Sequence, residues 1–264
     1  MTTDVGAAYS ATGAAWQAGP GRIYDRLAEL LVDTCPGGVA GRRVLDVGAG
    51  TGAASRAADR AGAAAVVAVD IAAGMLDGWT GPRPPAAVGD ARLLPFRAGS
   101  IDAVVAAFSL NHVPDPAVAL ADAARVLAPG GGLAASAYSV DDTHPVKSVV
   151  EGVLTERGWA PAGWYEHVRS DTVPLLATTD RAHAAADEAG LVGSEARRLD
   201  VPFPHLTPIE LVEWRLGMAA TAPFVAGLTA SDRAAVVGDV LDRLGPDPEP
   251  LVRRIVVLTW QAPS

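Results

Sequence analysis

The chain has 264 residues and a mass of 26.9 kDa, enough for a single α/β domain that buries a core without disulfides or metals. A formal net charge of −9 and a pI near 5.0 argue against a protein that grips nucleic acid phosphates. Cys35 is the only cysteine, which excludes an internal disulfide and a thiolate-rich metal site.

The start of the chain has no basic segment followed by a continuous apolar core, and no later stretch approaches the length of a membrane span. We therefore expect a soluble cytoplasmic protein with neither a membrane nor a nucleic acid partner. No metal site is expected.

The first half of the chain alternates helical and strand patterns. Apolar residues at helical spacing predict an N-terminal helix over residues 20–34. Apolar runs predict strands, and the segments between them predict helices. The predicted elements are a strand at 43–47, a helix at 53–61, a strand at 65–69, a helix at 72–79, a weak strand at 85–88, a strong strand at 101–108, a helix at 115–127 and a strand at 133–138.

The second half is predicted to be more helical. Thr229 and Asp232 fit a capping box at the start of one helix. The elements are a helix at 180–189, a strand at 195–201, helices at about 207–220 and 230–244, and a last strand at 255–260. We expect one domain: an N-terminal helical cover (1–35), a cofactor-binding core (41–140), and a helical lid inserted before the last strand (205–245).

Alternating strands and helices indicate a parallel sheet covered on both faces, with any ligand at the carboxyl ends of the strands. Asp46, Asp70, Asp90 and Ser109 all fall at or beside such ends. The sheet edge that they share is the predicted binding site.

The sequence DVGAGTG, Asp46 to Gly52, places glycines at every second position behind the first strand. Glycine lets the backbone turn sharply, visit positive φ and lie close to a ligand. A bound cofactor is one explanation and a tight connection without ligand is another. GAGTGA also satisfies the loose G-x-G-x-x-[GA] dinucleotide fingerprint, so the glycines alone leave a dehydrogenase open.

Five segments in order extend this pattern: VLDVGAGTG, VDIAAGML, GDARLLPF, SIDAVVAAFSLNHVPDP and RVLAPGGGL. Over residues 44–139 the chain resembles the class I S-adenosylmethionine (SAM) dependent methyltransferases, in the branch of quinone-biosynthesis and natural-product enzymes. The resemblance implies a Rossmann-like, seven-stranded, mostly parallel sheet with an antiparallel last strand and helices on both faces. Ile101 and Ala128 depart from residues common in the family, away from the cofactor site.

The resemblance also implies how SAM is held and its product, S-adenosylhomocysteine, released. The glycines approach the methionine half, Asp46 lies near its ammonium group, Asp70 accepts from the ribose hydroxyls, and Asp90 with the Ala91 amide holds the adenine edge. The predicted cofactor-binding residues are Asp46, Gly48, Gly50, Gly52, Asp70, Ile71, Met75, Asp90, Ala91 and Ser109.

His112, in SLNHVPDP, is the predicted catalytic base or orienting residue, because a histidine pKa suits proton transfer. A turn-shaping role for His112 stays open, and His144 is a weaker candidate. The expected reaction is methyl transfer to a small organic molecule, on oxygen or carbon rather than nitrogen. The alternative is a SAM-binding protein without methyl transfer, either a cyclase or a regulatory or scaffold subunit.

Overall fold

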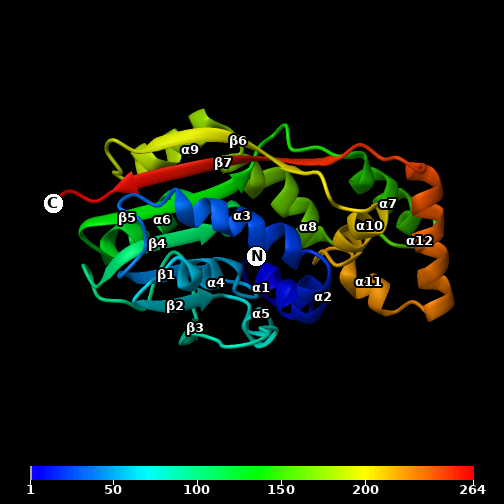
Figure 1. Cartoon of the computed structure of the whole chain (residues 1–264), viewed down its shortest axis with the longest axis horizontal. Helices are drawn as coiled ribbons and strands as arrows, with labels where there is room; N and C mark the ends of the chain where they lie inside the picture. Colours follow the sequence, from blue (N-terminus) through cyan, green and yellow to red (C-terminus); the bar gives the residue numbers. More distant parts are fainter. Residues whose placement is uncertain (1) are drawn as a thin grey trace.

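Within the described residues, 2–264 with side chains from Val5 onward, a seven-stranded sheet forms the centre of this computed structural model (Figure 1). The strands lie in the order β3-β2-β1-β4-β5-β7-β6. β7 runs antiparallel to both neighbours and the other pairs are parallel, as predicted. The bounds are β1 (Arg43–Val47), β2 (Ala65–Asp70), β3 (Ala86–Val88), β4 (Ile101–Ala107), β5 (Leu127–Tyr138), β6 (Glu195–Phe203) and β7 (Leu251–Gln261).

Helices cover both faces of the sheet, which explains why the central strands are apolar on both sides. α3 (Gly21–Asp33) and α4 (Ala53–Arg60) contribute to one core, where Leu27 and Leu31 are fully buried. α6 (Pro116–Val126) and α9 (Thr179–Glu188) contribute to the core on the other face, around Leu120. The predicted helices at 20–34, 53–61, 115–127 and 180–189 are confirmed within one or two residues.

A helical group lies beyond the carboxyl end of β5, at one end of the molecule (Figure 1). α10 (Pro208–Leu216) and α12 (Ala230–Leu244) pack on each other and on α7 (Pro145–Thr155), a helix that the sequence patterns did not predict. The Thr229 hydroxyl accepts from the Asp232 amide at 3.1 Å and donates to the Asp232 carboxylate at 2.7 Å. Among the described residues the N-cap half of the predicted capping box is thus present, and the reciprocal bond to the Thr229 amide is not. α11 (Ala222–Ala226) completes this group. The remaining short helices are η1 (Leu110–His112), α8 (Gly163–His167), η2 (Val168–Thr172) and η3 (Val173–Leu176).

In the part of the chain that the structure describes, no helix combines the length and apolarity needed to cross a bilayer. Cys35 is buried as a free thiol.

The N-terminal helices α1 (Thr2–Ser10) and α2 (Gly13–Ala18) lie on α5 (Ala73–Asp77) with their backbones in contact. A Cβ added at Gly74 would stand 2.0 Å from the Ser10 carbonyl oxygen, and one at Gly13 would stand 2.4 Å from the Gly74 carbonyl oxygen. These glycines are required for the close approach, because no side chain fits between the two segments.

Gly74→Ala is therefore expected to destabilise the protein by about 1 to 3 kcal/mol, the usual cost of overpacking. Gly152→Ala is the matched control, because Gly152 is also helical and a Cβ there meets nothing within 4 Å. That change should raise the free energy of unfolding by about 1 kcal/mol through helix propensity. Denaturant unfolding of both variants measures the difference, and equal effects would contradict the described docking of α1.

Candidate functional site

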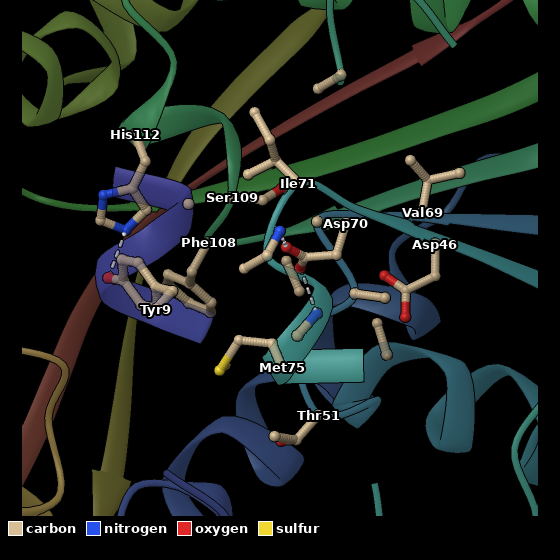
Figure 2. Close-up of a pocket in the computed structure, with 18 of the residues that line it drawn as sticks. Tyr9, Asp46, Thr51, Val69, Asp70, Ile71, Met75, Phe108, Ser109 and His112 are labelled. Carbon is tan, nitrogen blue, oxygen red and sulfur yellow. Dashed lines mark hydrogen bonds between the residues drawn. The ribbon is translucent and has the colours of Figure 1, made fainter. Parts of the chain in front are cut away.

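A cavity of about 150 Å³ lies at the carboxyl ends of β1, β2 and β4, under the N-terminal helices (Figure 2). Every predicted cofactor-binding residue except Gly52 lines it, together with His112. Among the described residues, none from the predicted lid (205–245) lines the cavity, and its helical cover comes from α1, α2 and α3 instead. A closing role for 205–245 stays a prediction.

Residues on two other segments occupy the space that side chains on the glycine turn would need. Gly48 has φ of 69°, and a Cβ there would lie 2.1 Å from the Cβ of Ser109. Gly52 has φ of 89° and begins α4, where a Cβ would meet the Trp79 ring at 2.6 Å. The Trp79 indole also donates to the Gly50 carbonyl at 2.6 Å. Gly52 thus makes room for Trp79, a contact that the motif did not reveal.

Asp70 links the end of β2 to the glycine turn. Its Oδ2 accepts from the Gly50 amide and its Oδ1 accepts from the Ala72 amide, both at 2.7 Å. Burial raises the pKa of the Asp70 carboxyl, and these backbone donors oppose that rise. Each oxygen keeps a further lone pair, so the carboxylate fits the ribose diol that the resemblance assigns to it.

Asp46 is fully buried at the end of β1. The Ser55 hydroxyl donates to its Oδ2 at 2.6 Å, while Oδ1 has no partner among the described residues. Burial raises the pKa of Asp46 to about 6. A buried carboxylate oxygen without a donor is costly, and the ammonium group of SAM is a donor of the right charge. This unsatisfied oxygen is the observation in the structure that best fits the cofactor.

SAM affinity is therefore expected to fall as the pH drops below about 6, by up to roughly tenfold per pH unit, because a protonated Asp46 loses its attraction for the ammonium group. The contribution of Asp46 to the free energy of unfolding of the protein without SAM should change with pH in the opposite direction. The folded pKa exceeds the unfolded value of 3.8, so this group stabilises the fold in acid and that contribution is lost as pH rises from about 4 to 6.

Calorimetry across this pH range measures the affinity, and Asp46→Asn is the control that should bind SAM weakly with little pH dependence. Asp70 and Arg56 also act on the Asp46 charge, so both remain unchanged in the comparison. A wild-type affinity that stays constant from pH 7 to 5 would contradict the placement of Asp46 beside the ammonium group.

The residues predicted for the adenine half also line the cavity. Asp90 follows β3 and pairs with Arg92 at 2.6 Å, which lowers the pKa of its carboxyl. Ala91 and Met75 also line the cavity, and Ile71 is 38% exposed beside it. The Asp90 carboxylate is thus already engaged by a guanidinium, although its oxygens retain lone pairs for another donor.

His112 stands at the end of the cavity that carries aromatic side chains (Figure 2). Its Nε2 lies 3.3 Å from the Tyr9 hydroxyl, and its Nδ1 is buried without a partner among the described residues. Burial lowers the pKa of His112 to about 4, so the ring is neutral at physiological pH. Burial also raises the pKa of Tyr9. A neutral imidazole beside a protonated phenol can accept a proton or orient a polar group.

An aromatic wall, formed by Tyr9, Trp16, Tyr24 and Phe108, completes this end of the cavity. Trp16 and Tyr24 have ring centroids 4.7 Å apart, and Tyr24 meets Phe108 edge-on at 5.6 Å. Phe108 has φ of 55°, a conformation that costs free energy in a bulky residue. Ser109, which follows it, donates its hydroxyl to the Val47 carbonyl at 2.6 Å and so ties β4 to β1.

His144, the other candidate histidine, lies at the start of a helix. His144 begins α7, where its Nδ1 accepts from the Val146 amide at 3.2 Å and its Nε2 lies 2.8 Å from the Glu249 carbonyl. It does not line the cavity. His144 is therefore a helix cap and not a group of the site.

Comparisons with known proteins agree with this geometry. A family model described as a methyltransferase domain matches residues 45–135. A demethylmenaquinone methyltransferase from Renibacterium salmoninarum is 40% identical over 59% of this chain and 63% of its own length. The chain thus spans slightly less than two thirds of that relative. One from Paenarthrobacter aurescens is 31% identical over 78% of this chain and 80% of its own length.

Among solved structures, phosphoethanolamine N-methyltransferase 2 of Haemonchus contortus, in complex with SAM, superposes with a TM-score of 0.53 at 19% identity. The match covers 85% of this chain and 49% of that chain. At this identity it bears on the fold alone. Together with the match to most of the Paenarthrobacter sequence and the glycine turn between β1 and α4, these findings show that the chain belongs to the class I SAM-dependent methyltransferases, in the quinone-biosynthesis branch.

Proposed function

We propose that the protein transfers the methyl group of SAM to a small organic molecule in a biosynthetic reaction, on an oxygen or carbon atom. The observation that carries the proposal is one continuous cavity in which Asp46, Asp70 and the glycine turn face an aromatic wall with a neutral histidine. The part of the cavity with the two carboxylates and the glycine turn fits the cofactor, and the part with the aromatic wall and the histidine fits an organic acceptor.

The residues at the cofactor end act mainly by positioning. SAM, when bound, supplies an electrophilic sulfonium methyl group. Asp46 and Asp70 would hold the ammonium and ribose groups, and the glycine turn would admit the methionine half without a side chain in the way. Holding two reactants near attack geometry supplies about 7 to 11 kcal/mol of a barrier, so positioning provides most of the expected acceleration.

The aromatic wall favours a flat, largely apolar acceptor. Tyr9, Tyr24 and Phe108 bring ring faces and edges to the cavity, and such groups stack on aromatic or conjugated molecules. His112 lies next to this wall, with its Nε2 3.3 Å from the Tyr9 hydroxyl. His112 is placed to take a proton from an acceptor hydroxyl or an acidified carbon as the bond to the methyl group forms.

The main alternative is a protein of this fold that binds SAM without transferring its methyl group. Turnover distinguishes the two functions. The purified protein should convert labelled SAM to S-adenosylhomocysteine with a component of a small-metabolite pool, and a labelled methyl group should appear in an organic product. Tight SAM binding with no labelled product from any pool would favour the alternative, and methylation of bulk protein or RNA would contradict a small acceptor.

A further inference from the structure

A second cluster of polar side chains lies behind the aromatic wall, outside the cavity. It consists of Tyr138, Trp214, Arg215 and Arg253, together with Lys147, and we name it the arginine cluster. Tyr138 ends β5, Arg253 is near the start of β7, Trp214 and Arg215 are in α10, and Lys147 is in α7. The Arg253 guanidinium lies over both aromatic rings, 4.0 Å from the Tyr138 centroid and 4.7 Å from the Trp214 centroid.

The arginine cluster holds three buried nitrogen atoms that lack a partner among the described residues. They are Trp214 Nε1, Arg215 Nε and Arg253 Nη1. Each of these atoms can only donate a hydrogen bond. Trp214, Arg215 and Arg253 are at most 7% exposed, so bulk water does not satisfy them. Buried groups of this kind normally have a partner, and the missing partner must be an acceptor.

The charges of the arginine cluster also favour an acceptor that is anionic. Arg253 donates to both oxygens of Asp142, at 3.0 and 2.5 Å. Arg215 lies 3.5 Å from a Glu151 oxygen, which also accepts from Tyr165 at 3.2 Å. The Lys147 ammonium group makes no hydrogen bond or ion pair in the described part of the chain, and burial with the nearby Arg215 lowers its pKa. Three cationic side chains thus face two carboxylates.

Aromatic contacts connect the arginine cluster to the cavity. The Tyr138 ring stacks on Phe108 with centroids 4.5 Å apart, and it meets Tyr24 at 6.2 Å. Phe108 and Tyr24 both line the cavity. The family model ends at residue 135, so every member of the cluster lies outside the matched region.

We propose that the arginine cluster is a subsite for a carboxylate carried by the methyl acceptor, which places the acceptor among organic acids rather than neutral quinols. The inference rests on the proposed function, because it assumes that the cavity takes an acceptor. A carboxylate offers several lone pairs to the Arg and Trp donors and balances the surplus positive charge. The acceptor's ring or chain would extend past Phe108 into the aromatic wall.

The test compares benzoate with benzamide, which have the same ring but differ in charge, on protein saturated with S-adenosylhomocysteine. Calorimetry should show benzoate binding about tenfold or more tightly than benzamide, as charged hydrogen bonds require. Lys147→Met and Arg215→Gln should each bring the ratio of the benzoate affinity to the benzamide affinity close to one. Neither variant should change the affinity for S-adenosylhomocysteine. Arg243→Gln is the matched control, because Arg243 pairs with an exposed Glu156 on the surface, and it should retain the ratio.

Three results would overturn the proposal: equal binding of benzoate and benzamide, no benzoate binding at millimolar concentration, or a ratio that survives in both cluster variants. Acetate and chloride distinguish a site for free ions. If either binds as tightly as benzoate, the cluster holds a solvent anion and not the acceptor. The proposed function fails separately, by the absence of SAM turnover. If labelled products form but elute as neutral molecules on anion exchange, methyl transfer stands and the carboxylate subsite is refuted.

Discussion

Replacement of His112 with alanine is expected to lower turnover by about 10² to 10⁴ fold while SAM affinity changes little, if His112 removes a proton in the transition state. The ring lies beside Tyr9 at the aromatic end of the cavity, away from Asp46 and Asp70, the carboxylates that we propose hold the cofactor. Because the pKa of His112 is about 4, turnover of the wild-type enzyme should not decline between pH 7 and 6 through protonation of this ring.

Two further variants separate a proton-transfer role from a packing role. His112→Gln preserves most of the side-chain volume and a polar end, so it should restore thermal stability without restoring turnover. Tyr9→Phe removes the hydroxyl that lies 3.3 Å from Nε2 and should have a smaller effect than either histidine variant. If His112→Ala retains near-normal turnover, positioning alone carries the reaction. If it instead loses SAM affinity, His112 shapes the turn after β4.

Replacement of Asp70 with alanine is expected to weaken SAM binding by about 1 to 3 kcal/mol, the range for hydrogen bonds to a charged group. Two effects act together. The ribose hydroxyls lose their acceptor, and the amides of Gly50 and Ala72 lose the carboxylate oxygens that hold the glycine turn. Calorimetry with SAM and with S-adenosylhomocysteine should show losses of similar size, because both ligands carry the same ribose.

Asp102→Ala is the control for Asp70. Asp102 is also an aspartate of the parallel sheet, but it lies near the start of β4 and pairs with Arg43 at 2.6 Å. Its removal should leave SAM affinity unchanged. An unaltered affinity in Asp70→Ala would remove Asp70 from the binding site and leave it as a residue that only supports the turn.

The parallel core of the fold could be predicted because its strands are continuous apolar runs. Residues 43–47, 65–69 and 101–108 each have the pattern of a buried strand. A polar residue lies at the carboxyl end of each: Asp46 inside the first, and Asp70 and Ser109 directly after the other two. The order of strands then determines which ends meet. Asp46, Asp70 and Ser109 consequently line one cavity, as their positions at the strand ends predict. No side-chain contact had to be known for this prediction.

Contacts between distant segments could not be predicted, because they depend on tertiary packing. Tyr9 and His112 are 103 residues apart, and nothing in either local pattern pairs them. The approach of α1 and α2 to α5 depends on Gly13 and Gly74, whose spacing is not periodic. The sequence patterns do not predict α7. His144 and Pro145 mark its start, but histidine is an uncommon helix cap.

Calorimetric titration of the purified protein with SAM determines whether the cavity is a SAM site, on which both the proposed reaction and the carboxylate subsite depend. SAM and S-adenosylhomocysteine should each give a measurable heat of binding and raise the melting temperature, and NAD should not bind. If both ligands leave the heat and the melting temperature unchanged while NAD binds, the glycine turn serves a dinucleotide and the SAM assignment is wrong.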